Sequence, residues 1–205
     1  GQGVRKNPFE AVKWYRNAAE QGHAQAQYNL GVLCERGEGV EKNLSEAFKC
    51  YLKAAKQGYA PSQFSLGLSY FDAEGVSQDR AEAVKWWKKA AEQGHVMSIC
   101  NLGVCYENGY GVEKDLDKAL EYYFSAVEKG DGQSAYNLGA CYYNDENKIC
   151  DKVKACAWLL LALERGFKMA ESTLNDVKME ITKEDFESAK ELFKKGKKEG
   201  FKLLL

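Results

Sequence analysis

Apolar and small residues recur along this chain with a period of 36 residues. Within each period the apolar positions follow helical rather than alternating spacing, and glycine-rich or polar segments separate them. A fixed period of this length is typical of solenoids, in which each unit buries its apolar face against its neighbours. The repeat is plainest in four Leu-Gly pairs: Leu30-Gly31, Leu66-Gly67, Leu102-Gly103 and Leu138-Gly139.

Each period is predicted to hold two helices. The first, over residues 24–36 in one unit, ends at the segment 37–40, because glycine readily takes the left-handed conformation that ends helices. The second begins at Asn43, whose side chain can accept a hydrogen bond from first-turn amides, and it ends near Gly58. Glu46 follows Asn43 at the spacing of a capping box. The capping position repeats as Asn7, Asn43, Asp79, Asp115 and Asp151.

Small and aromatic residues at fixed places indicate how the helices pack. Gly31, Ala47 and Ala54 allow neighbouring helices to approach closely, and aromatic side chains fill the space between hairpins. The sequence therefore predicts an all-α fold, a right-handed α/α solenoid of stacked antiparallel helix pairs with 36-residue repeats. The aromatic positions are Trp14-Tyr15, Tyr51, Trp86-Trp87, Tyr122-Tyr123 and Trp158.

Residues 26–31 (Ala-Gln-Tyr-Asn-Leu-Gly) and 37–40 (Gly-Glu-Gly-Val), followed by the paired alanines of the second helix, resemble the Sel1-like repeat. That repeat is a relative of the tetratricopeptide repeat with a longer loop inside each hairpin. The resemblance covers residues 1–166 and implies one continuous domain, which we expect to begin within a longer protein. Its parts are a half repeat (loop and second helix) at 1–22, four full repeats at 23–58, 59–94, 95–130 and 131–166, and C-terminal capping helices at 167–205.

Two segments depart from the pattern. Residues 144–148 (Asn-Asp-Glu-Asn-Lys) replace the Gly-x-Gly-Val loop in the fourth repeat. Beyond the repeats, Ala170 and Leu174 keep the register of a first helix, and Thr182 is predicted to cap a helix that runs to about Lys198. Terminal units of a solenoid are commonly atypical because their outer face meets water.

Composition excludes some classes of partner. The formal charge of −1 and the pI near 6.3 argue against a nucleic-acid partner, since such proteins usually present a net basic surface. The chain contains no run of 18 apolar residues that would predict membrane insertion. We expect a monomeric or weakly associating chain.

The seven cysteines do not predict a disulfide framework. One branch of the resembling family has a disulfide in each repeat, between cysteines eight residues apart. Here those positions are Ala19/Gln27, Ala55/Gln63, Ala91/Ile99 and Val127/Ala135. We interpret the cysteines as small buried thiols, which favours a cytoplasmic location. A periplasmic or secreted location stays open if a signal peptide was removed.

The sequence does not predict catalysis, a metal site or a cofactor. It contains no Cys-x-x-Cys, the spacing typical of zinc sites. His23 and His95 share a repeat column with Tyr59 and Asp131, which suggests a solvent-facing helix start. Some relatives have been linked with penicillin binding, but no serine here has a lysine three positions on, as that chemistry requires.

The resemblance implies a non-catalytic scaffold or adaptor that binds a peptide or partner protein on the concave face of the solenoid. In related tetratricopeptide units, the residues facing this groove lie three and two before, and one, four and five after, the motif glycine. Aromatic side chains there would supply burial, and carboxamides could pair with a partner's backbone. The candidate groove residues are Tyr28, Asn29, Val32, Glu35, Arg36, Phe64, Leu68, Phe71, Asn101, Val104, Glu107, Tyr136, Asn137 and Tyr143.

Three alternatives stay open at this stage. Tyr28, Phe64 and Tyr136 could pack against the adjoining repeat instead of facing a partner. The protein could bind a small molecule or have a cell-wall-related, penicillin-binding-like activity. It could also be a structural spacer within a longer protein.

Overall fold

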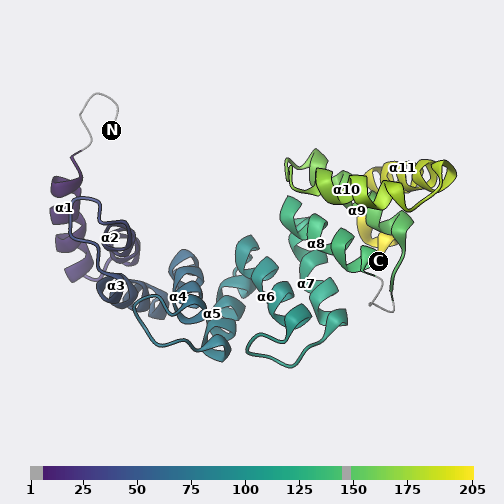
Figure 1. The fold of residues 1–205 in the computed structure, drawn as a ribbon. Helices are drawn as coiled ribbons and strands as arrows, with labels where there is room; N and C mark the ends of the chain where they lie inside the picture. The colour runs from purple at the N-terminus through teal and green to yellow at the C-terminus, as the bar shows by residue number, and fades with distance from the viewer. Residues whose placement is uncertain (1–6, 145–148) are drawn as a thin grey trace. The chain divides into compact units, whose positions relative to one another are not determined.

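The structure is a computed structural model that describes residues 7–144 and 149–205. Within these ranges the chain is helical and contains no strand, as the all-α prediction requires (Figure 1). The predicted departure at residues 145–148 and the first six residues of the half repeat lie outside the described ranges. The helices are α1 (Pro8–Glu20), α2 (Ala24–Arg36), α3 (Leu44–Lys56), α4 (Ala60–Asp72), α5 (Arg80–Glu92), α6 (Val96–Asn108), α7 (Leu116–Glu128), α8 (Gly132–Tyr143), α9 (Lys152–Glu164), α10 (Ala170–Met179), α11 (Lys183–Glu199) and the 3-10 helix η1 (Phe201–Leu204).

Each second helix of a repeat begins at the predicted capping residue. The Oδ1 atom of Asn43 accepts a hydrogen bond from the Glu46 amide at 2.9 Å, which is the amide half of the predicted capping box. The complete box is present at Thr182, where the Asp185 carboxylate also accepts from the Thr182 amide at 3.2 Å. The sequence-predicted starts of these helices are therefore confirmed.

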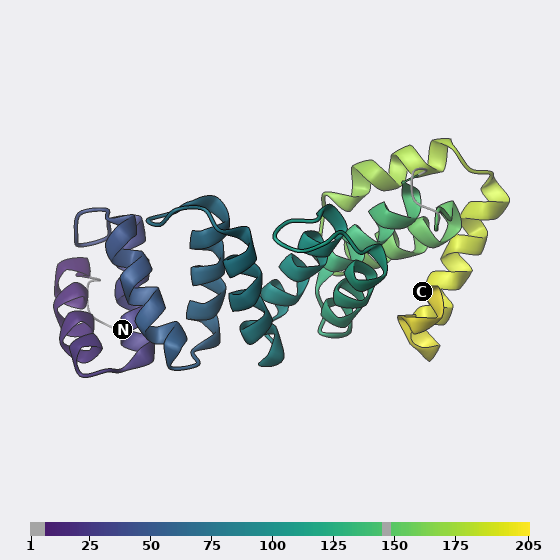
Figure 2. The ribbon, with the colours of Figure 1, turned by 90° about the horizontal axis from the view of Figure 1, so that it is seen from below.

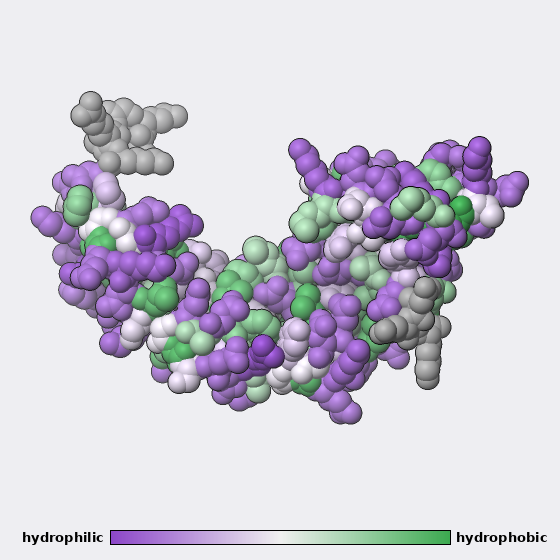
Figure 3. All heavy atoms as spheres, viewed as in Figure 1, coloured by the Kyte–Doolittle hydropathy of each residue, from purple (hydrophilic) through white to green (hydrophobic). Residues whose placement is uncertain are grey.

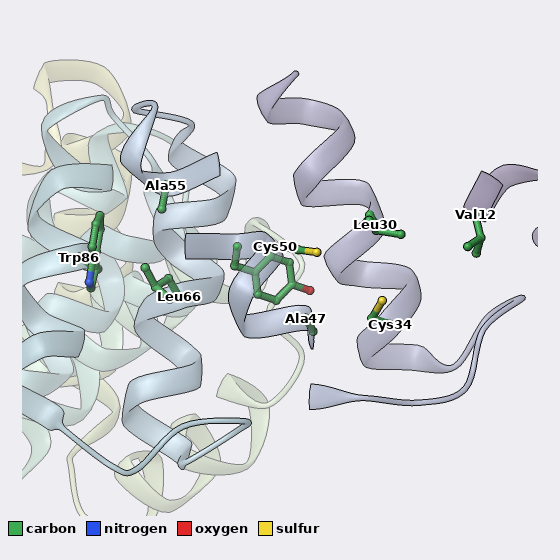
Figure 4. Packing of buried hydrophobic residues seen from close by; sticks show 9 residues of the cluster. Val12, Leu30, Cys34, Ala47, Cys50, Ala55, Leu66 and Trp86 are labelled. Carbon is green, nitrogen blue, oxygen red and sulfur yellow. The ribbon is translucent and has the colours of Figure 1, made fainter. Parts of the chain in front are cut away.

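The chain divides into two compact units, residues 1–114 and 115–205. Unit 1 contains α1 to α6, and each of these helices packs against the next one along the chain (Figure 2). Its core contains Leu30, Leu66 and Trp86, all buried among small residues (Figure 4). Tyr51 belongs to the same buried cluster. The finer division into one half repeat, four repeats and a cap stays a prediction.

The Leu-Gly column of the sequence is explained by one recurrent contact. A bulky side chain of the second helix lies directly against the glycine of the first helix in the same repeat. A Cβ added to Gly67 would lie 2.5 Å from Trp87 Cδ1, and a Cβ added to Gly31 would lie 2.6 Å from Tyr51 Cε1. The indole of Trp87 also donates from Nε1 to the Phe64 carbonyl at 3.1 Å. A residue larger than glycine would push the two helices apart.

A second glycine column joins consecutive repeats. Gly75 adopts φ +73° in the loop after α4, and its α-carbon faces the first turn of α3 in the preceding repeat. A Cβ added there would lie 2.8 Å from the Ser45 amide nitrogen. Gly39 and Gly111 make the same approach to the starts of α1 and α5. The Gly-x-Gly-Val loop is therefore a docking element between repeats.

Buried glutamines hold the junctions where a related branch has disulfides. Gln63 is buried, and its Nε2 donates to the Ala55 carbonyl at 3.3 Å, while its Oε1 accepts from Gln93 Nε2 at 2.7 Å. Gln27 makes the corresponding bond to the Ala19 carbonyl at 3.1 Å. In these two junctions a hydrogen bond takes the position of a covalent link.

Unit 2 is built around α9. This helix is apolar on more than one side, and it contacts α8, α10 and α11. Its Trp158 is fully buried, and the ring of Phe201 from η1 lies 5.9 Å from the Trp158 ring. Helices α10 and α11 occur where Leu174 and Thr182 predicted them.

Six of the seven cysteines are buried, as expected. The prediction is wrong for Cys150, which is exposed between α8 and α9 because it lies outside the helices.

Candidate functional site

Four of the candidate groove residues meet at one pocket in unit 1. The pocket has a volume of about 190 Å³ and lies between α4 and α6, the first helices of consecutive repeats. Leu68 and Phe71 line it from α4, and Asn101 and Val104 line it from α6. In Figure 3, apolar surface is visible among hydrophilic atoms over α4 to α6. The spacing around the motif glycine thus identified residues that lie together in space.

Trp87 and Cys105 complete the apolar lining. Trp87 lies on Gly67 and is held by its hydrogen bond to the main chain of α4, so the packing of the repeat fixes its position. Sequence reasoning did not place Trp87 or Cys105 at the site. The recurring aromatic at Tyr51 and Trp87 was a usable signal, because a side chain that packs on the motif glycine also lies beside the groove positions.

An aromatic and cationic cluster borders this pocket. The Phe71 ring lies 5.4 Å from the Trp87 ring and 5.7 Å from the Tyr110 ring. The Arg80 guanidinium lies 5.2 Å from the Phe71 ring centre and 4.7 Å from that of Tyr110. Such cation–π contacts stabilise an exposed guanidinium by about 0.5–1 kcal/mol. Phe71, which makes three of these contacts, forms one wall of the pocket.

The polar groups of the pocket suit recognition rather than chemistry. Asp72 is exposed at the rim, and the half-buried Asn101 offers both a donor and an acceptor. Burial raises the pKa of the Cys105 thiol to about 12, which keeps it protonated at neutral pH. A protonated thiol is a poor nucleophile, so this cysteine contributes apolar surface.

The candidate residues of α2 do not join this pocket. Glu35 accepts a hydrogen bond from the Tyr51 hydroxyl at 2.5 Å, and burial is the main cause that raises the pKa of Tyr51. Arg36 is exposed, and its guanidinium lies 3.7 Å from the Glu38 carboxylate. Val32 packs against the core cluster of unit 1. Asn29 lies in a separate open groove between α1 and α2.

The aromatic column of the candidate groove packs against the next repeat. The ring of Tyr28 lies 5.6 Å from that of Tyr59, and the ring of Phe64 lies 4.8 Å from that of His95. Both side chains stay half-buried, so part of each ring remains accessible. The prediction of a solvent-facing helix start is wrong for Tyr59 and His95, which are half-buried beneath these rings, and it holds for His23, which is exposed.

His95 also caps α6. Its Nδ1 accepts from the amide of the buried Ser98 at 3.3 Å and lies 3.0 Å from the Ser98 hydroxyl. Burial lowers the pKa of His95, and no other cause contributes. Protonation would remove the acceptor at Nδ1 and charge a ring that is packed on Phe64. Neutral His95 is therefore the form that fits the fold.

We expect stability to fall at acid pH because of His95. Its pKa is lower in the folded than in the unfolded protein, so its contribution is complete above the unfolded value of about 6.5. The contribution is lost as the pH falls from there through the folded pKa, at no more than about 1.4 kcal/mol per pH unit for one group. When the free energy of unfolding is measured in urea between pH 8 and pH 5, it should change less with pH in His95→Asn than in the parent. Asparagine keeps a capping side chain at this position. His23→Asn is the matched control, and an unchanged slope in His95→Asn would contradict the assignment.

In unit 2 the candidate residues are engaged within the chain. Tyr136 lies 5.1 Å, ring to ring, from Phe167, which repeats the contact of Phe64 with His95. The Tyr143 hydroxyl donates at 2.6 Å to Glu180, the residue that directly follows α10, and this hydrogen bond is the main cause that raises the pKa of Tyr143 to about 12. Asn137 on α8 is half-buried. In unit 1, Glu107 near the end of α6 is also half-buried.

Across residues 7–144 and 149–205, no group of three or more His, Cys, Asp or Glu side chains could hold a metal ion. None of the helices described is long and apolar enough to cross a membrane.

Stacked two-helix units of constant length, with a side-chain pocket between consecutive first helices, define a helical repeat protein of the solenoid class. The chain belongs to the Sel1 repeat family: the Sel1 repeat is matched at residues 1–23, 24–59, 60–95, 96–131 and 132–167. The predicted resemblance is therefore confirmed. Sel1 repeat proteins are generally scaffolds for protein–protein interaction and are generally non-catalytic.

Several solved structures share this fold. A Sel1 repeat protein from Oxalobacter formigenes is 35% identical with a TM-score of 0.80, and the match covers 91% of this chain and 78% of that one. The protective antigen c5321 of uropathogenic Escherichia coli is 36% identical with a TM-score of 0.72, and the match covers 79% of this chain but only 34% of that one. The immunity protein Pa5087 of Pseudomonas aeruginosa is 26% identical with a TM-score of 0.54, covering 81% and 62%. None of the curated proteins matches the chain.

Proposed function

We propose that this protein is a non-catalytic scaffold that binds a peptide or protein partner along the first helices of its repeats. The pocket between α4 and α6 is the anchor point of this binding in unit 1. The observation that carries the proposal is the convergence of Leu68, Phe71, Asn101 and Val104 on one apolar pocket. The general role of Sel1 repeat proteins supports the same conclusion.

The chemistry of the pocket favours an apolar side chain of the partner. Leu68, Phe71, Trp87 and Val104 present carbon surface, and burial of such surface contributes about 25 cal/mol per Å². Hot spots of interfaces commonly combine an aromatic-lined pocket with nearby polar groups. Asn101 can pair with main-chain groups beside the anchored side chain.

The aromatic column, Tyr28 and Phe64 in unit 1, contributes to the packing between repeats as well as to the groove surface. Because Tyr28 and Phe64 pack on the next repeat, alanine at these positions would remove stacking contacts as well as groove surface. Loss of binding in such variants would be ambiguous. Leu68 and Val104 are better probes, since both line the pocket and are half-buried.

The test compares a pocket variant with a matched variant of the second helices. Leu68→Ser/Val104→Ser removes apolar surface from the pocket. The control, Lys49→Ser/Lys53→Ser, introduces the same two serines at exposed positions of α3. Proteins retained from extract by the parent chain are identified, and their affinity is then measured with purified material. We expect the pocket variant to bind at least about tenfold more weakly, equivalent to about 1.4 kcal/mol, and the lysine variant to bind as the parent does.

Two results would contradict this proposal. If the lysine variant lost binding and the pocket variant kept it, the partner would bind the second helices. If the folded parent retained no protein, a structural spacer would be the better description. Circular dichroism and thermal melting of each variant establish that it is folded before binding is compared.

A further inference from the structure

A second surface of unit 1 is incompletely covered. Trp14 on α1 is 70% exposed and Phe9 is 68% exposed, although both are large apolar side chains. An open groove of about 680 Å³ lies beside Trp14, lined by Trp14, Tyr15 and Ala18 of α1, by the capping residue His23, and by Ala24 and Asn29 of α2. Among the described residues, no helix lies over this face of α1.

The same surface occurs a second time in the chain, and there it is covered. Residues 10–14 and 18–23 read Glu-Ala-Val-Lys-Trp and Ala-Ala-Glu-Gln-Gly-His, and residues 82–86 and 90–95 have the identical sequences. The second copy forms α5 and the start of α6. Trp86, which corresponds to Trp14, is only 7% exposed. Two identical sequence patterns therefore differ in what packs on them.

Helix α4 covers the groove side of the second copy, which corresponds to the open groove beside α1. It packs along α5, and its Gly67 lies against Trp87, which corresponds to Tyr15. Its Phe64 stacks on His95, which corresponds to His23, with the ring centres 4.8 Å apart. Trp86 belongs to one core cluster with Leu66 of α4 and with Ala55 of α3, so α4 contributes to the burial of this tryptophan and also stacks on His95.

We propose that the face formed by α1 and the start of α2 is a docking surface for a helix with the chemistry of α4. The occupant carries an aromatic residue, then leucine two positions later and glycine three positions later, as in residues 64–67 (Phe-Ser-Leu-Gly). Its glycine receives the ring of Tyr15, its aromatic ring covers His23, and its apolar face covers Trp14. The partner is therefore another helix of the Sel1-repeat kind.

The glycine of the occupant is the specific part of this inference. An apolar helix of any sequence could cover Trp14, because burial of carbon surface is not directional. A helix with a side chain at the glycine position could not approach, since a Cβ at Gly67 already comes within 2.5 Å of the Trp87 ring. Selectivity for glycine separates repeat-type docking from general hydrophobic adhesion.

The test uses a capped synthetic peptide of residues 60–72, added to the full chain. Trp14 is the exposed tryptophan, while Trp86, Trp87 and Trp158 are at most 7% exposed, so a blue shift of tryptophan emission reports the burial of Trp14. We expect a saturable blue shift that is absent from a Trp14→Phe chain. A peptide with Gly67→Leu should bind at least tenfold more weakly.

A fusion addresses a weakness of the peptide experiment, because a short isolated helix is poorly formed in water. Residues 59–72 are placed directly before Gly1, where the loop spacing matches that between α4 and α5, and linkage raises the effective concentration to the millimolar range. We expect the fusion to blue-shift Trp14 and to raise the melting temperature, and the same fusion with Gly67→Leu to do neither. Absence of a shift in both peptide and fusion, or equal effects of glycine and leucine, would overturn the proposal. A shift that depends on chain concentration without any peptide would also overturn it, in favour of a second copy.

Discussion

Replacement of Gly67 by leucine is expected to destabilise unit 1 by about 3 kcal/mol or more. The reason is that the Trp87 ring lies where the new side chain must go, and Trp87 is itself only 2% exposed and hydrogen-bonded to α4. Neither the helix nor the indole can move without opening the core between α4 and α5. Urea unfolding followed by circular dichroism measures the loss, and hydrogen exchange should localise it to these two helices.

A leucine placed nearby on the same helix is the control for Gly67→Leu. Ser65 is half-buried and two positions away, so Ser65→Leu changes the composition of α4 without meeting Trp87. We expect this variant to unfold within about 0.5 kcal/mol of the parent. If Gly67→Leu were as stable as Ser65→Leu, the close packing of Trp87 on glycine would not be needed by the fold.

Replacement of Gly75 by alanine is expected to cost about 3 kcal/mol or more, although only one methyl group is added. At φ +73° an alanine is strained by about 1–2 kcal/mol. The added Cβ would also lie 2.8 Å from the Ser45 amide nitrogen, which is main chain and cannot rotate away. The loop would have to lift from α3. Thermal and urea unfolding of the full chain measure the effect.

Gly58 allows the two causes to be separated. It has φ +86°, yet nothing lies within 4 Å of a Cβ added there. Gly58→Ala therefore carries the backbone strain alone, and we expect a loss of about 1–2 kcal/mol. A Gly75→Ala loss no larger than that of Gly58→Ala would show that the loop does not dock tightly between repeats.

The helices could be predicted because their signals are local and repeated. The caps at Asn43 and Thr182 and the glycines after the helices are each read from a few residues, and the 36-residue period repeats them in register. The period also predicted that repeats stack. It did not reveal that the second loop glycine, Gly75, faces the preceding repeat, because a glycine required for φ and one required for space look the same in sequence.

The candidate site was harder to predict. Repeat columns assign a residue to a face of its helix, and for Leu68 and Val104 this was sufficient to bring them to one pocket. The repeat columns do not predict which side chain of the next repeat packs against a given residue. The His95 column was misread for this reason: different residue types in one column suggested tolerance, whereas the structure shows that His95 packs on Phe64 and caps α6. Such pairings arise from tertiary contacts between repeats, which the sequence alone does not show.

The pocket between α4 and α6 has walls from two repeats, with Trp87 from the helix that joins them. A bound side chain would therefore contact both repeats at once and strengthen the interface between them. By linkage, the energy of binding is added to the energy needed to separate those repeats. A partner bound in this way would make the interface between the two repeats more rigid. After its release, only the contacts within the chain would resist separation of the repeats.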